Sequence, residues 1–346
     1  MSSKKKVFLN GALFIGIFAL TFWGVFHGQN PGELREAIEG CQGVWLLPAA
    51  FCVFVFIWGE SVIIWHMLDT YGIRIRKRLC FLFSSVGFFF SCVTPSASGG
   101  QPMQIYFMKK EKVPVPVATV VLMIVTIIYK LVLVVIGVGI MVFARDFEAR
   151  YLSEILPVFY LGVALNVFCV SSMILLVFHP FLAKKILVKG VHILERMHLL
   201  RHREGRLAKL ESSMDLYNET ASFMRDHIGL MLRVFLITFA QRTALFAVTC
   251  FIYRAFGLSG TGWMTILVLQ AVISVSVDML PLPGGMGISE SLFMIIFEPV
   301  FGALLLPGMI VSRGMGYYSE LLISALFTLM AVAVFGYREK RKQKKN

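Results

Sequence analysis

The sequence predicts an all-α polytopic membrane protein with about six full spans, two re-entrant helical hairpins and an inverted-topology repeat. Three observations lead to this prediction. Hydrophobic residues make up 58% of the 346 residues and charged residues only 15%, so the chain is far more apolar than a soluble domain. Several apolar runs reach the roughly 20 residues that a helix needs to cross a bilayer core. Prolines and glycines interrupt two of these runs, and irregular backbone at that depth must be buried in protein or line a cavity.

The first half of the chain begins with an apolar run from Val7 to Phe26, which has no evident small-x-small cleavage site and is predicted to be a retained span. A second span is predicted over residues 44–67. Basic residues after it mark the cytoplasmic side, where the N-terminus then also lies. Residues 80–108 are too few for two spans, so they are predicted to form a hairpin with its tip at Thr94–Pro102. A span over residues 115–143 follows.

The second half repeats this order. Spans are predicted over residues 157–178 and 228–253. Residues 263–300 are interrupted by the sequence PLPGGMG, after which too few residues remain for a full span, and this predicts a second hairpin that enters from the outside. The last segment, residues 301–337, is longer than one span, so a kink or a separate short helix is predicted near Arg313 and the two glycines after it.

The two halves, residues 1–144 and 145–346, are expected to be inverted repeats within a single membrane domain, because each has an odd number of full crossings. Most of the 33 lysine and arginine residues fall on the cytoplasmic side of this topology. That asymmetry predicts a multi-pass membrane protein with both termini in the cytoplasm. The hairpins then enter from opposite faces, and their tips can meet near the middle of the bilayer.

A polar insert, residues 179–227, separates the fourth span from the fifth. His198 and His202 in this insert have the spacing of two zinc ligands, but they lie among arginines without an H-E-x-x-H motif, which favours a solvated helix face over a metal site. The insert is also the surface on which a separate lipid-modifying synthase would dock. Its apolar residues recur at helical spacing and predict an amphipathic helix on the inner leaflet: Leu187, Val191, Leu194 and Met197.

Each hairpin tip is followed by a predicted helix start. Ser98–Gln101 fits an S-x-x-Q capping box, and Gly287–Glu290 places a carboxylate at the equivalent position. Free N–H groups and the positive end of the helix dipole suit a phosphate, and the glycines would let a ligand approach the backbone. Glu290 is either a capping residue or part of the transport machinery. The candidate substrate-binding residues at the tips are Pro95, Ser98, Gly99, Gly100, Gln101, Pro281, Pro283, Gly284, Gly285, Gly287, Ser289 and Glu290.

Paired breaks at matching positions of inverted repeats are typical of transporter binding sites. The plain alternative is that both breaks are kinks packed in protein. Ionisable residues within spans are costly, so they are functional candidates by default. The charged candidates in the spans are Glu60, Lys130, Arg242, Asp278, Arg313 and Glu320.

Among these candidates, Lys130 and Arg313 follow the two glycine pairs at similar distances along the chain, so each half would supply one cation to a bound phosphate. Arg242 and Asp278 are also candidate substrate-binding residues. Snorkelling to an interface and structural ion pairs are the alternatives. A transported proton would couple through Glu60, Asp278 or Glu290.

Several other chemistries find no support in the sequence. The chain has no G-x-x-x-x-G-K-[ST] motif for a nucleotide-driven pump and no G-x-S-x-G elbow. Its six cysteines show no C-x-x-C pairing and are interpreted as small buried hydrophobic residues. The formal charge of +13 is explained by the basic cytoplasmic segments, so no nucleic-acid partner is expected. We expect no cofactor and no metal.

At "LPLPGGMGISE" and "TPSASGGQP" the chain resembles the membrane region of lysylphosphatidylglycerol synthases, a flippase-like family, and the resemblance covers essentially the whole chain. Gln101 stands where many members have an acidic or basic residue, which leaves the head-group preference open. Arg313 also resembles a family feature. The family pattern L-P-x-P-G-G-x-G-x-x-E is matched by Leu280, Pro281, Pro283, Gly284, Gly285, Gly287 and Glu290, and a weaker pattern, P-x-x-x-G-G, by Pro95, Gly99 and Gly100.

The resemblance implies a location in the bacterial cytoplasmic membrane. It also implies that the membrane region moves a lipid between leaflets, as it is thought to do for aminoacylated phosphatidylglycerol in the fused relatives. In those relatives a separate soluble C-terminal domain transfers the amino acid from tRNA. The chain ends ten residues after Gly336, so we expect no transferase domain. We therefore predict a flippase or scramblase-like transporter for an anionic or aminoacylated phospholipid, or for a polyprenyl-phosphate-linked lipid. Two alternatives stay open: a phosphatidylglycerol lysyltransferase, and a non-transporting subunit that docks a cell-envelope synthase. Homo-oligomerisation is also left open.

Overall fold

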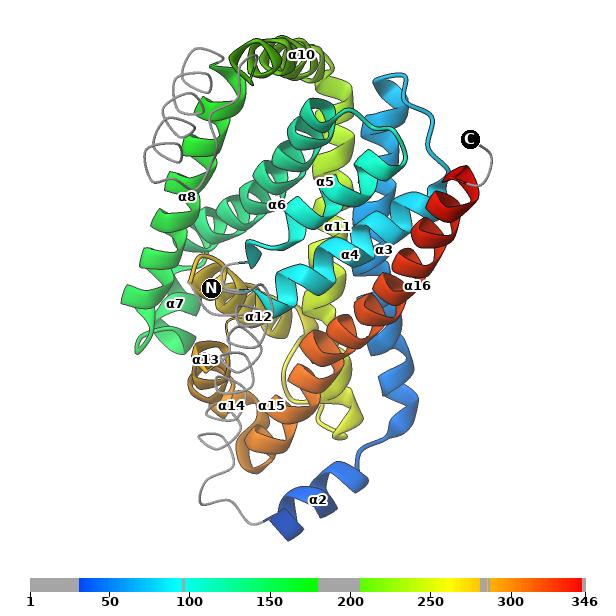
Figure 1. The fold of residues 1–346 in the computed structure, drawn as a ribbon. Coiled ribbons are helices and arrows are strands. Elements are labelled where there is room, and N and C mark those ends of the chain that lie inside the picture. Colours follow the sequence, from blue (N-terminus) through cyan, green and yellow to red (C-terminus); the bar gives the residue numbers. More distant parts are fainter. Residues whose placement is uncertain (1–30, 95–96, 180–205, 281–284, 286, 344–346) are drawn as a thin grey trace, which may run out of the picture.

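The structure is a computed structural model that describes residues 31–94, 97–179, 206–280, 285 and 287–343 (Figure 1). All the regular secondary structure of these residues is helical. Several sequence predictions fall on other parts of the chain and lie outside the described residues: the span from Val7 to Phe26, the insert residues from Leu187 to His202, and the tip residues Pro95, Pro281, Pro283 and Gly284.

Five segments of the described residues are long and apolar enough to cross a membrane, which confirms an all-α polytopic membrane protein. The predicted span over residues 115–143 coincides with α6, and the other predicted spans that fall on described residues agree with the structure to within a few residues. The segments are Gly43–Thr70, which contains η1 (Gly43–Trp45) and α3 (Leu46–Thr70); α6 (Val115–Phe143); α8 (Leu156–Phe178); α11 (Ile228–Ala255); and the composite segment Glu298–Phe335.

Both predicted hairpin segments consist of helices that are too short to cross a bilayer alone. The first contains α4 (Lys77–Val93) and α5 (Gly100–Lys110), and the second contains α12 (Trp263–Val277) and α13 (Ile288–Ile296). The longest of them, α4, has 17 residues, which is about 25 Å of helix against a core of about 30 Å. The lengths fit re-entrant hairpins, whose position relative to a bilayer stays a prediction.

The predicted break in the last segment is confirmed. A π-helical turn follows Arg313 and includes both glycines. The elements from this part of the chain are α14 (Glu298–Phe301), η4 (Gly302–Leu304), α15 (Leu305–Arg313), the π-helical segment η5 (Gly314–Tyr318) and α16 (Ser319–Gln343).

The described part of the polar insert is α10 (Arg206–Asp226), which lies across one end of the bundle (Figure 1). Its buried residues Met214, Tyr217, Ala221 and Met224 recur at helical spacing and belong to the same core as residues of α6 and α11. The apolar face of α10 is therefore covered by protein. Two short helices complete the described chain: α2 (Pro31–Glu39) and α7 (Arg145–Tyr151).

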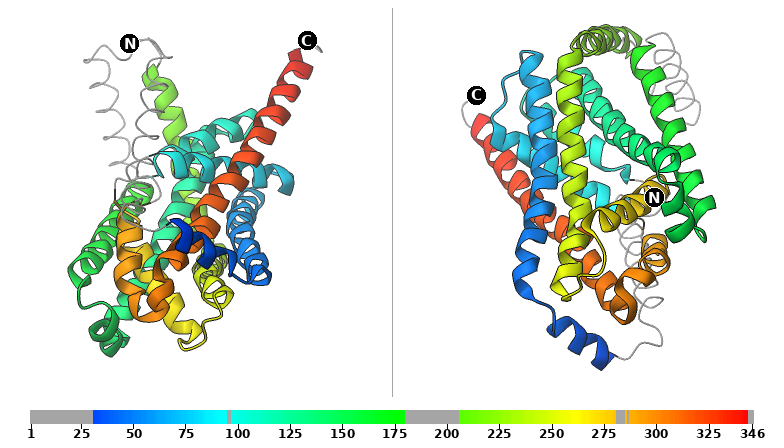
Figure 2. Two further views of the ribbon diagram at one scale, coloured as in Figure 1. Left: turned by 90° about the horizontal axis from the view of Figure 1, so that it is seen from below. Right: turned by 180° about the vertical axis from the view of Figure 1, so that it is seen from behind.

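The apolar interior divides into two main cores. The first core joins α4, α5, α10 and α16 to parts of α3, α6 and α11. The second core joins α12, α13, α14 and α15 to other parts of α6, α8 and α11. A smaller cluster lies where α3 packs along α11, which run side by side in the view from behind (Figure 2). Several long helices thus contribute to both cores.

Candidate functional site

Residues from both hairpin tips line one cavity of about 530 Å³. The first tip contributes Ala97, Ser98 and Gln101, and the second contributes Gly285 and Ser289. Further lining residues come from α3, α4, α6, α11, α12, η5 and α16. Two loops that are almost 190 positions apart in the sequence, at Ser98 and Gly285, are therefore brought to a common space.

The glycines of the two tips have different roles. At Gly100 a Cβ would meet the Ser91 side chain and the Gly87 carbonyl oxygen, so this glycine permits the close packing of α5 on α4. Gly285 lines the cavity and has φ +66°, a conformation that favours glycine. The predicted open approach to the backbone is thus wrong for Gly100, whose Cα faces a neighbouring helix, whereas Gly285 does face the cavity.

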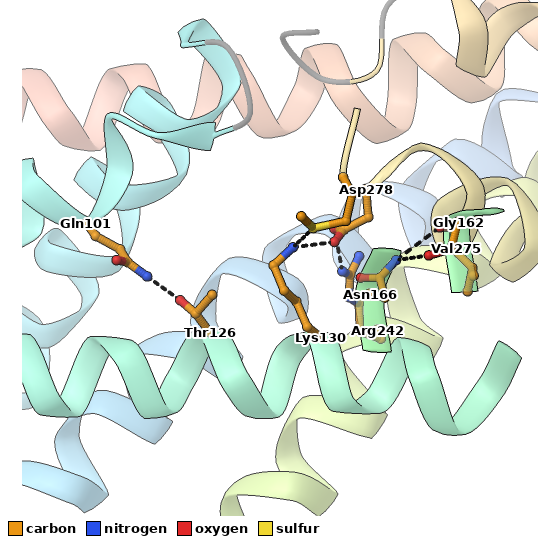
Figure 3. Close-up of polar contacts among 9 residues, drawn as sticks. Gln101, Thr126, Lys130, Gly162, Asn166, Arg242, Val275 and Asp278 are labelled. Atoms are coloured by element: carbon orange, nitrogen blue, oxygen red, sulfur yellow. Dashed lines mark hydrogen bonds and ion pairs between the residues drawn. The ribbon is translucent and has the colours of Figure 1, made fainter. Parts of the chain in front are cut away.

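Asp278, at the C-terminal end of α12, gathers two cations (Figure 3). Its Oδ2 accepts a hydrogen bond from Lys130 Nζ at 2.6 Å, and its Oδ1 lies 3.4 Å from Arg242 Nη2. The Arg242 side chain is only 5% exposed and stacks on the ring of Tyr129 at 3.4 Å from the ring centroid. Its Nε is buried without a hydrogen-bond partner among the described residues. This cation cluster of Lys130, Arg242 and Asp278 contains two positive charges and one negative charge.

Arg313 lies at the other end of the second tip. Its Nε donates a hydrogen bond to Glu290 Oε1 at 2.7 Å. Glu290 Oε2 accepts a hydrogen bond from the backbone N–H of Gly287 at 2.7 Å, as the predicted capping role requires. Arg313 also lines the cavity, so both of the predicted cations reach it. Lys130 is ion-paired with Asp278, which follows α12 next to the second tip.

The capping box predicted for the first tip is wrong. Helix α5 begins at Gly100, and its N-cap residue, Gly99, forms no side-chain cap. The Gln101 amide instead donates a hydrogen bond to Thr126 Oγ1 on α6 (Figure 3). Thr94 Oγ1 accepts a hydrogen bond from the Gly99 N–H at 2.8 Å and so satisfies one of the free backbone donors at this helix start. The box fails because the helix starts after Ser98 and Gln101 faces α6.

Glu60 and Glu320 line the same cavity and form no ion pair with any described residue. Glu60 Oε1 accepts a hydrogen bond from Gln104 Nε2 at 2.6 Å. Glu320 Oε1 lies 3.5 Å from the Cys92 thiol. The sequence analysis missed Gln104 and Tyr129. Gln104 lies three residues after Gln101 and so on the same helix face, which is a usable signal. No comparable spacing pointed to Tyr129.

Asn166 on α8 holds the last turn of α12. The Asn166 side chain is fully buried, and its Nδ2 donates hydrogen bonds to the carbonyl oxygens of Gly162 at 2.9 Å and Val275 at 3.2 Å (Figure 3). A helix end has carbonyl groups without intrahelical partners, and Val275 is one of the last residues of α12. Asn166 therefore stabilises the turn that carries Asp278. A single asparagine in an apolar run offered no sequence signal for this contact.

Gly162 makes this contact between α8 and α12 possible, and its replacement tests it. A Cβ at Gly162 would lie 2.6 Å from the Val275 carbonyl oxygen and 2.7 Å from Ser276 Cα, and this backbone cannot move away as a side chain would. We expect Gly162→Ala to cost about 1–3 kcal/mol and to lower the thermal unfolding midpoint in detergent. Gly139→Ala on α6 is the control, because nothing lies within 4 Å of its added Cβ. Equal midpoints for the two variants would contradict the α8–α12 contact.

The cavity can bind a group that is both charged and partly apolar. Its cations come from Lys130, Arg242 and Arg313, and aromatic and aliphatic side chains form much of the remaining wall. Buried guanidinium and ammonium groups bind phosphate through charge-assisted hydrogen bonds. The described residues contain no group of three or more His, Cys, Asp and Glu side chains that could hold a metal ion.

The fold and the cavity define a multi-pass α-helical membrane protein with a charged pocket among its spans. The chain belongs to the family described as the lysylphosphatidylglycerol synthase transmembrane region, whose model matches residues 7–335. This match confirms the resemblance found in the glycine-rich motifs. Comparison with curated proteins gives no match.

Proposed function

We propose that this protein is a lipid transporter that moves a phosphate-bearing lipid between the two leaflets of its membrane. The lipid is an anionic or aminoacylated phospholipid, or a polyprenyl-phosphate-linked lipid. Its phosphate binds at Lys130 and Arg242, while its tails remain in the bilayer. The observation that carries the proposal is the cavity of about 530 Å³ that both hairpin tips line and that contains these buried cations.

The cation cluster supports an anionic ligand because its two cations are ion-paired with a single carboxylate, Asp278. Asp278 is shared between two cations, and its separation from Arg242 Nη2 is 3.4 Å, which is long for a charge-assisted bond. A buried guanidinium group is costly in a membrane protein unless it is well paired. A phosphate would supply further acceptors to Arg242, including one for Nε, which has no hydrogen-bond partner within the described part of the chain.

Alternating access would come from two inverted repeats, residues 1–144 and 145–346. The packing supports this division, because equivalent helices of the two halves have equivalent neighbours. Helix α3 packs along its counterpart α11 at the centre, α4 packs on α3 and α16, and α12 packs on α11 and α6. Of the three carboxylates considered for proton coupling, Asp278 and Glu290 are ion-paired, which leaves Glu60 as the better candidate.

The direct test is lipid movement in proteoliposomes. Purified protein in phosphatidylcholine vesicles is expected to expose fluorescent phosphatidylglycerol in the inner leaflet to an external quencher faster than protein-free vesicles do. The same assay with a fluorescent lipid that lacks a phosphate reports whether the phosphate is recognised. No movement of any phosphate-bearing lipid above the protein-free rate would contradict the proposal.

The family description also names a synthase, so lysyltransferase activity needs its own measurement. Purified protein would be incubated with lysyl-tRNA and phosphatidylglycerol, and we expect no lysyl lipid. Docking of a separate synthase is tested by comparing pull-downs with the full chain and with a chain that lacks residues 179–227. A partner that depends on this insert, together with an absence of lipid movement, would favour the docking alternative.

A further inference from the structure

The π-helical segment η5 joins two helices that belong to different cores. On its N-terminal side, α15 packs in the core that contains α12 and α13. On its C-terminal side, α16 packs in the core that contains α4, where the rings of Phe83 and Phe335 stack at 5.9 Å. Each side of η5 is therefore attached to a different hairpin. Single π-helical turns within helices occur frequently at functional sites.

One side chain of η5, Tyr317, contacts the first hairpin. The hydroxyl of Tyr317 donates a hydrogen bond to the carbonyl oxygen of Cys92 at 2.9 Å. Cys92 lies in the last turn of α4, where carbonyl groups have no intrahelical partner. The neighbouring Phe90 carbonyl is satisfied locally by Thr94 Oγ1, whereas the Cys92 carbonyl depends on a residue 225 positions away. Tyr317 thus holds the end of α4 next to the first tip.

The residue just before η5, Arg313, contacts the second hairpin. Arg313, the last residue of α15, donates to Glu290, and Glu290 caps the start of α13 next to the second tip. The two side chains also contact each other, because the Arg313 guanidinium lies 4.9 Å from the ring centroid of Tyr317. One helical turn of the chain is therefore in contact with both hairpins at their tip-proximal ends.

We propose that Gly314–Tyr318 is a hinge on which the two hairpins move relative to each other. Tyr317 and Arg313 are positioning residues that couple the movement of one tip to that of the other. The inference rests on the proposed function, since this relative movement would open the cavity to each side in turn. In this proposal Tyr317 acts by holding the backbone at the end of α4, and no contact between Tyr317 and the lipid is required.

The two glycines of the hinge support this role. A Cβ at Gly314 or at Gly316 would meet nothing within 4 Å, so packing does not require a glycine at either position. Glycine is a poor helix former because its backbone has more conformations to lose, whereas alanine favours regular helix. Two glycines within one π-helical turn therefore make η5 easier to bend than the helices on either side.

The first experiment replaces Gly314, the hinge glycine that does not line the cavity. Gly314→Ala is expected to fold with an unchanged or higher unfolding midpoint and to bind fluorescent phosphatidylglycerol within twofold of the wild-type affinity. Its rate of lipid movement is expected to fall tenfold or more. Gly139→Ala, near the C-terminal end of α6 and with equally open space, is the control and should keep the wild-type rate. A Gly314→Ala variant that moves lipid at the wild-type rate would overturn the hinge.

The second experiment does not depend on transport. Hydrogen exchange of the amides of α5 and α13 would be measured in phosphatidylcholine nanodiscs with and without phosphatidylglycerol. In the wild-type chain we expect both hairpins to respond together. In Tyr317→Phe, which removes only the hydroxyl, we expect α13 to respond and α5 to lose its response. A response of both hairpins in Tyr317→Phe, or of neither in the wild type, would overturn the coupling.

The two experiments separate the failure of the hinge from the failure of the proposed function. A wild-type chain that moves no lipid, yet shows the joint response of both hairpins and its loss in Tyr317→Phe, would retain the hinge and contradict transport. A Gly314→Ala variant that moves lipid normally would retain transport and contradict the hinge.

Discussion

Arg242→Gln is expected to move lipid in proteoliposomes about 10–100-fold more slowly than the wild-type chain, because a lost charged hydrogen bond costs about 1.5–3 kcal/mol. Arg242 is the more deeply buried cation of the cluster, and its Nε has no partner among the described residues. The variant should still fold, because Lys130 remains paired with Asp278 at 2.6 Å. The measurement is the rate of quenching of fluorescent phosphatidylglycerol, with the unfolding midpoint recorded in parallel.

The matched control is Arg254→Gln. Arg254 is in the last turn of the same helix, α11, and its guanidinium contacts the Leu258 carbonyl oxygen rather than the cavity. We expect this variant to move lipid at the wild-type rate. If Arg242→Gln and Arg254→Gln have equal rates, the phosphate does not bind at the cation cluster.

Gly285→Val is expected to slow lipid movement strongly, because Gly285 belongs to the second tip and lines the cavity. The Gly285 backbone has φ +66°, and an added Cβ would lie 3.1 Å from the Val277 side chain. A β-branched residue in this conformation is strained by roughly 1–2 kcal/mol and would also occupy space in the cavity. Both effects act on the tip that approaches the cation cluster, so we expect a loss of more than tenfold in rate.

Gly302→Val distinguishes the two effects. Gly302 has φ +54° with nothing within 4 Å of an added Cβ, and it does not line the cavity. Both variants should lose stability through backbone strain, which thermal unfolding measures. Only Gly285→Val should lose transport. If the two variants lose stability and transport in equal proportion, strain rather than the cavity explains the result.

The spans could be predicted because hydropathy and length are local properties of the chain. Helix α6 ends where the apolar run ends, and the interruption after Arg313 follows from two glycines within one turn. The glycine-rich tips were also recognisable, since prolines and glycines in an apolar run break helices whatever surrounds them. These predictions required no knowledge of which helices are neighbours.

The partners of the charged residues could not be predicted in the same way. Similar spacing after the two glycine pairs predicted one cation from each half, but it could not show that Lys130 pairs with Asp278, which is 148 positions away at the second hairpin. Gln101 was expected to cap its own helix, and it contacts Thr126 instead. Each outcome depends on how far a helix is rotated about its axis when it packs.

The sequence by itself determined the helical class of this protein, the places of its apolar helices and the existence of two glycine-rich breaks, because membrane helices form wherever a run is long and apolar enough. Only the tertiary structure decided that both tips line one cavity, that Arg242 and Lys130 share Asp278, and that η5 contacts both hairpins. These contacts join residues far apart in the chain, and they depend on the packing of whole helices rather than on local composition.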